Sequence, residues 1–135
     1  MISINRQSDY AIQLVVALSK VNEKEPLSLR KFSTDSNISF LFLQRIARSL
    51  KNAKLIDSNR GMYGGYFLVK DIKKITVKEI MEGVEGTFGV TACFRGHTCP
   101  RSKTCTAKQV LNSLNLQLDK ILSNMVVADY IVKSK

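Results

Sequence analysis

The chain has 135 residues, 44% of them apolar, which suits one compact domain plus an extra element and argues against wholesale disorder. Its longest aliphatic run, residues 14–18, is far too short to span a bilayer, and no signal-peptide pattern follows the N-terminus. We therefore expect a cytoplasmic protein with no membrane partner. The net charge of +10, with seven Lys or Arg and only two acids in residues 30–60, favours nucleic acid as the partner.

The N-terminal half predicts three helices followed by a β-hairpin. Apolar residues recur at helical spacing over about 3–20, Ser28 can cap a second helix to about 34, and Ser39 can cap a third over about 39–53. Two short apolar runs, 55–58 and 66–69, flank a glycine-rich turn, which is the pattern of a hairpin. This order of elements is typical of a winged helix-turn-helix domain.

The predicted third helix has an apolar face and a basic face. At about 100° per residue, one side collects Leu43, Ile46, Ala47, Leu50 and Ala53, and the other collects Gln44, Arg45, Arg48, Lys51 and Asn52. Guanidinium and amide groups serve base edges, and ammonium groups serve phosphates. We expect Ser39 and Leu41 to join this face at its N-terminal end. The alternative is a solvated helix face, but the absence of any acid between residues 37 and 54 favours DNA contact.

The hairpin turn, residues 60–66, is the predicted wing. Its glycines allow positive φ and close approach to a phosphate backbone, and Arg60 has the side chain that enters minor grooves. We also count Tyr63 among the expected DNA contacts. A tight glycine turn without any partner is the competing interpretation.

All three cysteines of the chain lie within thirteen residues, as Cys93-x5-Cys99-x5-Cys105, in a segment whose Gly96 and Pro100 predict a loop. An odd number of cysteines argues against a disulfide framework, and the spacing does not suit the paired knuckles of zinc modules. Three cysteines suit an iron–sulfur cluster, [4Fe-4S] or [2Fe-2S], with one other ligand or an exposed iron. A structural zinc, a metal-free protein, or a cysteine-dependent redox enzyme using His97 are the alternatives.

A last helix is predicted from about residue 106 to 124. Its apolar residues alternate steps of three and four, the pattern of a two-stranded coiled coil: Leu111, Leu114, Leu118, Ile121, Met125 and Ala128. Packing inside one domain would normally need a wider stripe, so we expect a homodimer. A capping box at residues 76–79 predicts one further short helix before the cysteines.

Together these features resemble the Rrf-type winged-helix transcription regulators over nearly the whole chain. The matching stretches are Asp9–Tyr10–Ala11, Ile38–Ser39 with Leu43–Gln44, Arg60–Gly61 with Gly64–Gly65–Tyr66, residues 75–80, and the cysteine loop. The resemblance implies homodimers whose long C-terminal helices cross, and a cluster on Cys93, Cys99 and Cys105 whose state alters operator binding.

Branches of that family differ in the fourth cluster ligand. The IscR-like branch uses a histidine three residues after the last cysteine, where this chain has Lys108, and the CymR-like branch lacks the cysteine set. The NsrR-like branch uses an aspartate of the other subunit's first helix, a place that Asp9 occupies. The resemblance therefore implies an NsrR-like site, although an acid at Asp9 is also favoured simply by the helix dipole.

We thus expect a mainly α protein with a winged helix-turn-helix DNA-binding domain over residues 1–80, and a cluster-binding loop and dimerisation helix over 81–135. The expected function is that of a DNA-binding regulator, a repressor that senses nitric oxide, iron or redox state, and not that of an enzyme. Its expected partners are a double-stranded DNA operator and a second copy of the chain.

Overall fold

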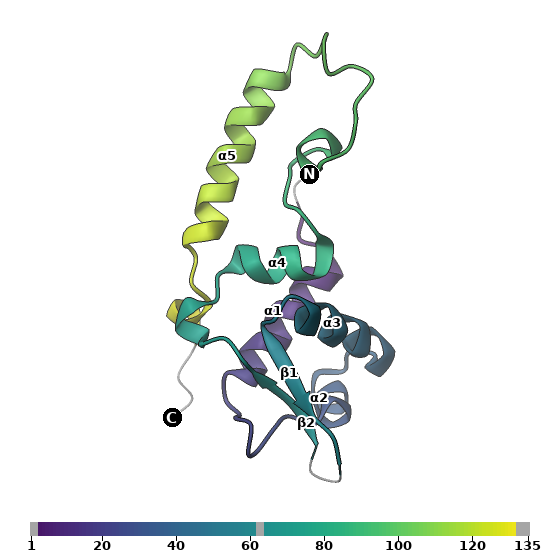
Figure 1. Ribbon diagram of the computed structural model, residues 1–135, viewed down its shortest axis with the longest axis vertical. Coiled ribbons are helices and arrows are strands. Elements are labelled where there is room, and N and C mark those ends of the chain that lie inside the picture. Colours follow the sequence, from purple (N-terminus) through teal and green to yellow (C-terminus); the bar gives the residue numbers. More distant parts are fainter. Residues whose placement is uncertain (1–2, 62–63, 132–135) are drawn as a thin grey trace.

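A computed structural model describes residues 3–61 and 64–131 (Figure 1). Its helices and strands follow in the order α1 (Arg6–Leu18), α2 (Leu29–Ser36), α3 (Phe40–Asn52), β1 (Ile56–Asn59), β2 (Gly65–Leu68), α4 (Val77–Glu85) and α5 (Lys108–Asn124). Three short 3₁₀ turns complete the described elements: η1 (Ile72–Lys74), η2 (Ala92–Arg95) and η3 (Val127–Tyr130). This arrangement confirms the predicted mainly α class with a winged helix-turn-helix.

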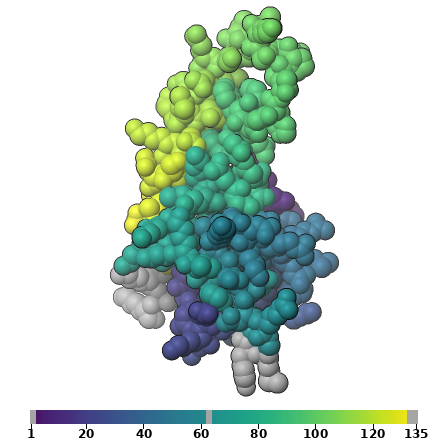
Figure 2. All heavy atoms as spheres, in the orientation of Figure 1, coloured from purple at the N-terminus to yellow at the C-terminus, as the bar shows by residue number. Residues whose placement is uncertain are grey.

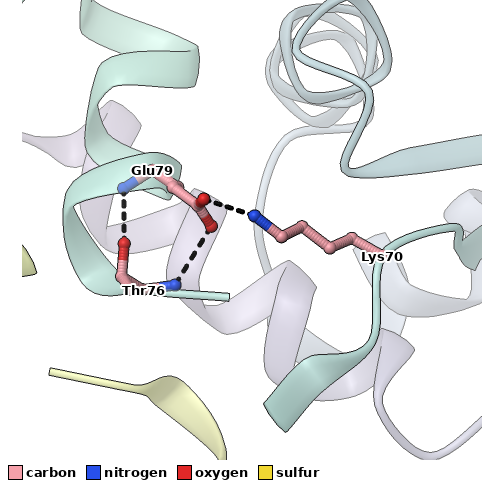
Figure 3. A network of polar contacts seen from close by, with 3 residues as sticks. All are labelled: Lys70, Thr76 and Glu79. Carbon is pink, nitrogen blue, oxygen red and sulfur yellow. Dashed lines mark hydrogen bonds and ion pairs between the residues drawn. The ribbon is translucent and has the colours of Figure 1, made fainter. Parts of the chain in front are cut away.

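Side-chain caps explain where the helices begin. Ser28 and Ser39 accept hydrogen bonds from backbone N–H groups in the first turns of α2 and α3, as predicted. Thr76 and Glu79 form the predicted capping box at the start of α4, each side chain accepting from the other residue's N–H at 3.2 Å. Figure 3 shows that Lys70, just after the hairpin, pairs with the same Glu79 carboxylate and so ties the hairpin to α4.

One hydrophobic core joins α1, α3, α4 and the hairpin. The largest fully buried apolar side chains in it are Leu14, Leu18, Leu43, Leu50, Ile56, Ile75 and Ile80. Ala53, predicted to lie on the buried face of the third helix, is exposed, because α3 ends at Asn52 and Ala53 is its C-cap. The core holds α3 from one side only and leaves its opposite face to solvent.

The hairpin is extended by a short third segment. Leu27 pairs with Tyr66 through two backbone hydrogen bonds of 2.8 Å, so the chain before α2 runs beside β2. A Cβ at Gly65 would collide with the Leu27 carbonyl group. This glycine is therefore required by the close approach of the chain's own backbone, a reason that the sequence pattern did not reveal.

Two parts of the molecule can be named from Figures 1 and 2. The body comprises residues 3–85 and 125–131, and the arm comprises residues 86–124, that is, the cysteine segment and α5. The arm stands clear of the body at the end opposite the hairpin. Within the described residues, no helix is both long enough and apolar enough to cross a membrane.

After α5 the chain returns to the body. Val126 pairs with Thr76, the Met125 carbonyl accepts from the Val77 N–H at 2.9 Å, and Val127 is buried in the core. Met125 and Ala128 lie beyond α5, which ends at Asn124, so the predicted apolar seam is not one continuous helical face, and the part of these two residues in a dimer stays a prediction. The division of the chain at residue 80 stays a prediction, and α4 continues past that point to Glu85.

Candidate nucleic-acid interface and cysteine segment

The exposed face of helix α3 carries the basic residues that the sequence predicted as DNA contacts. Leu43, Ile46, Ala47 and Leu50 are buried, while Gln44, Arg45, Arg48, Lys51 and Asn52 are exposed. Leu41 is 70% exposed at the N-terminal end of this face. In the part of the chain that the structure describes, the Arg45 and Arg48 side chains make no ion pair and no hydrogen bond. Both guanidinium groups therefore keep their donors available for an outside partner.

Lys51 behaves differently from the two arginines. Its Nζ lies 3.5 Å from Asp57 Oδ1 and donates to Ser58 Oγ at 3.1 Å, so it joins the last turn of α3 to strand β1. Both side chains of the ion pair are about half exposed. A cation that already has a carboxylate partner offers less to a phosphate, so the expected role of Lys51 in DNA binding competes with this internal role.

The predicted wing lies at the end of the hairpin. Arg60 is exposed and precedes Gly61, whose φ of +112° is a conformation that favours glycine. Tyr63, the remaining expected contact of the wing, lies outside the described residues. The geometry thus offers one exposed guanidinium at the wing beside two on α3.

The cysteine segment is anchored at its start to α5 and to α4 of the body. The Val90 N–H donates to Asn115 Oδ1 of α5 at 2.9 Å, and the Phe88 N–H donates to the Glu82 carboxylate at 2.8 Å. Arg95 donates from Nη2 to the Glu85 carbonyl at 3.5 Å, at the end of α4. Beyond η2 the segment runs in irregular turns, and almost all of its residues are exposed. It is a loop, as its glycine and proline predict.

The three thiols are accessible but are not gathered into one site. Cys93 and Cys105 are exposed and Cys99 is half-buried, and the Cys93 sulfur lies 3.0 Å from Thr91 Oγ1. Among the described residues of this single chain, no group of three Cys, His, Asp or Glu side chains is arranged to hold a metal ion. The donor chemistry nevertheless fits an iron–sulfur cluster, since cysteine sulfur is the ligand that such clusters use and residues 86–118 contain no acid that would repel an anionic centre.

Asp9 and His97 are both exposed, on separate elements. Asp9 lies in the first turn of α1, where Oδ1 accepts from the Gln13 side chain at 2.9 Å. His97 follows η2, and its backbone N–H donates to the Ala92 carbonyl at 3.1 Å. Neither residue meets two of the cysteines within the described chain.

A polar junction connects the start of α1 with the end of α4. The Glu85 carboxylate accepts from the side chains of Ser8, which is fully buried, and of Asn5, which caps α1. Because Arg95 binds the Glu85 carbonyl, the cysteine segment, α4 and α1 meet at this one residue. Sequence reasoning missed the junction, since its members lie about eighty positions apart.

Helix α5 has no buried residue over its seventeen positions. Leu111 and Leu118 are half-buried, and Leu118 and Ile121 both line a groove of about 410 Å³ between α5 and α4. Leu114 and Ile121 are exposed, and the exposed Val110 lies on the same side of the helix. We call these three residues the α5 ridge. The predicted seam therefore contains both half-buried and exposed residues, and Ile121 belongs to the α5 ridge and also borders the groove.

Comparison with known families identifies the family to which the chain belongs. A family profile, Rrf2, described as "Iron-dependent Transcriptional regulator", matches residues 4–133. The chain belongs to the Rrf2 family. It is a helix-turn-helix transcription regulator, which confirms the resemblance inferred from the wing and the cysteine spacing.

Relatives with assigned names come from more than one branch. The HTH-type regulator IscR of Sodalis glossinidius is 25% identical over 122 residues, covering 90% of this chain and 74% of the relative. CymR of Bacillus subtilis is 32% identical over 83 residues, covering 62% of this chain and 60% of the relative. Similarity to these two relatives does not assign the chain to one branch of the family, so the NsrR-like assignment remains a proposal.

Solved structures agree on the fold. The structure of CymR, the global cysteine regulator of B. subtilis, superposes with a TM-score of 0.78 at 22% identity and covers all of both chains. The structure titled "T. potens IscR" superposes with a TM-score of 0.72 at 22% identity, covering 96% of this chain and 85% of that one. Both similarities establish the winged architecture and the arm.

Proposed function

We propose that the protein is a DNA-binding transcriptional repressor whose operator affinity depends on an iron–sulfur cluster held by the cysteine segment. The observation that carries the DNA-binding part is the exposed face of α3, where Arg45 and Arg48 make no ion pair or side-chain hydrogen bond with the described residues, while the opposite face is fixed in the core. A recognition helix needs this combination, because base readout requires rigid placement and unused donors.

The cluster part rests on the donor set. Cys93, Cys99 and Cys105 would hold the cluster, and such a cluster supplies a centre that reacts with nitric oxide, oxygen or iron limitation. The fourth ligand in this proposal is the partner subunit's Asp9, whose carboxylate is exposed at the start of α1. A hard carboxylate is a weaker match for this iron than thiolate or imidazole, which makes that position the reactive one.

Dimerisation is the third part of the proposal. A seventeen-residue helix without a buried residue lacks the packing that normally stabilises helices in water. The α5 ridge of Val110, Leu114 and Ile121 is the face that a second copy would cover. Family membership and the apolar ridge both support a homodimer.

The test is direct binding to DNA. Duplexes selected from a random pool by the anaerobically purified protein would be titrated with wild type, Arg45→Ala, Arg48→Ala and a control, Lys74→Ala, on η1 away from α3. Each α3 variant should lose about 1–3 kcal/mol of operator binding if its guanidinium reads a base, and the control should not. Unchanged binding in both arginine variants, with the fold intact, would refute the recognition-helix assignment.

A metal-free regulator is the second candidate, and the similarity to CymR favours it. Iron and sulfide analysis of the anaerobically purified protein separates the two. A brown protein with stoichiometric iron supports the cluster, a colourless protein with zinc supports a structural metal, and a metal-free protein that binds its operator supports the second candidate.

A further inference from the structure

Arg30 lies outside the face of α3 that the sequence analysis assigned to DNA, yet the fold brings it there. Its guanidinium carbon lies 4.3 Å from the centroid of the Phe40 ring. Arg30 is exposed in the first turn of α2, and Phe40 is the first residue of α3. The contact therefore joins the first helix of the helix-turn-helix to the beginning of the recognition helix.

Phe40 is held from its other side. It is half-buried and packs against the hydrophobic core, so its ring is a fixed surface. A planar guanidinium stacked on an aromatic ring keeps its N–H groups pointing outward in the plane, while losing much of its rotational freedom. Arg30 is thus oriented before any ligand arrives, which lowers the entropic cost of using it.

The positive charge of Arg30 is also not paired with an acid of the described chain. In the described part of the chain Arg30 makes no ion pair, whereas Lys51 at the other end of α3 is paired with Asp57. An aromatic partner leaves the full positive charge available, while a carboxylate partner neutralises it. The two ends of the recognition helix therefore carry cations of different kinds.

The geometry points to Arg30 as a contact to a DNA backbone phosphate, positioned by Phe40. The inference rests on the proposed DNA-binding function. When a recognition helix enters the major groove, the preceding helix crosses the sugar–phosphate backbone, and α2 is that helix here. Phe40, on which Arg30 stacks, lies between Ser39 and Leu41 at the end of α3 that would approach the bases. A guanidinium fork in that position matches two phosphate oxygens.

The test uses full-length protein and two duplexes, the selected operator and a random sequence of the same length, over a range of salt concentrations. Arg30→Ala should weaken binding to both duplexes by the same factor, roughly eightfold at 0.1 M salt, since one lost phosphate contact reduces the magnitude of the negative slope of log K against log salt by about 0.9. Arg30→Lys should keep the slope and lose part of the affinity, because the charge remains without the planar stack. Lys74→Ala, which makes the same change of charge on η1, is the control.

Phe40→Leu tests the positioning role, because leucine keeps the apolar packing and removes the ring. It should weaken binding on its own and add little in the double variant with Arg30→Ala. Additive losses would show that the ring does not hold the guanidinium. Circular dichroism and thermal unfolding confirm that each variant is folded.

Failure of the inference can be told from failure of the proposed function. If Arg30→Ala matches Lys74→Ala on both duplexes while Arg45→Ala and Arg48→Ala lose operator binding, Arg30 is not a phosphate contact and the recognition helix stands. If the wild type binds neither duplex, the proposed function itself is overturned and the inference with it.

Discussion

The body and the arm bury their side chains to very different extents. Every buried residue of the described chain belongs to the body, including Val127, which returns to it after α5. No residue of the arm, 86–124, is buried. Four large apolar side chains of the arm are exposed to solvent: Val110, Leu114, Leu116 and Ile121.

This difference in burial shows how far each part is stabilised by packing within the single chain. The body holds α3 against a closed core and can present a recognition helix with the single chain alone. The arm has no buried residue, so packing within the described chain stabilises it less than it stabilises the body.

The largest effect is expected in the cysteine segment. Replacing Cys93, Cys99 or Cys105 singly with Ala should abolish the cluster or nearly so, because each removes one of only three thiolates. Asp9→Ala should keep a cluster with an altered visible spectrum and reactivity, and His97→Ala should change little. Anaerobic spectra with iron analysis measure all three; a spectrum perturbed by His97→Ala and not by Asp9→Ala would make the histidine the ligand.

The α5 ridge should decide assembly. Ile121→Glu places a charge in the expected interface and should yield monomers, detected by analytical ultracentrifugation at micromolar concentration. Leu116→Glu is the matched control, since Leu116 is 59% exposed and Ile121 54%, but they lie about 140° apart around the helix. A wild type that is already monomeric, or equal effects of both variants, would contradict the ridge as the interface.

Core truncation should separate the body from the arm energetically. Leu50→Ala removes a fully buried side chain and should lower the free energy of unfolding by about 2–5 kcal/mol. Leu116→Ala makes the same chemical change on the exposed arm and should cost less than about 0.5 kcal/mol. Urea unfolding followed by circular dichroism gives both values, and similar costs at the two sites would refute the contrast.

Lys51 should matter less for DNA than the arginines beside it. Because Asp57 and Ser58 already engage its ammonium group, Lys51→Ala should cost less than about 1 kcal/mol of operator binding. Asp57→Asn should release Lys51 and tighten binding to random DNA, and Lys51→Ala should then cost more in that background. Asp35→Asn, an exposed acid on α2, controls for the change of charge. Purely additive effects of the Lys51 and Asp57 changes would show that the pair is not maintained.

The smallest effect concerns the one ion pair between α4 and α5 in the described chain. Lys78 Nζ lies 2.8 Å from Asp119 Oδ1, and this hydrogen bond raises the pKa of Lys78 above its ordinary value of 10.5. A raised lysine pKa stabilises the fold below pH 10.5 and loses that contribution as the pH rises through the raised value. Asp119→Asn should therefore cost less than about 1 kcal/mol near neutral pH and nothing at more alkaline pH. A difference from wild type that persists at high pH would count against the pair.

Local chemistry is what the sequence by itself could determine. The caps at Ser28, Ser39 and Thr76, the apolar stripe of α3 and the glycine-rich hairpin turn act over a few residues, so their spacing predicted the elements and the winged fold. Exposure of Arg45 and Arg48 followed from the same periodicity, because the two faces of one helix are set by its repeat.

Contacts between distant residues could be found only in the tertiary structure. Lys51 meets Asp57, Arg30 stacks on Phe40, Glu85 receives Ser8, and the segment after α5 pairs with Thr76. None of these pairs has a periodic signature, since each depends on how whole elements pack. The end of α5 at Asn124 agrees with the predicted helix, but the backbone pairing of residues 125–127 with the body has no signature in the sequence.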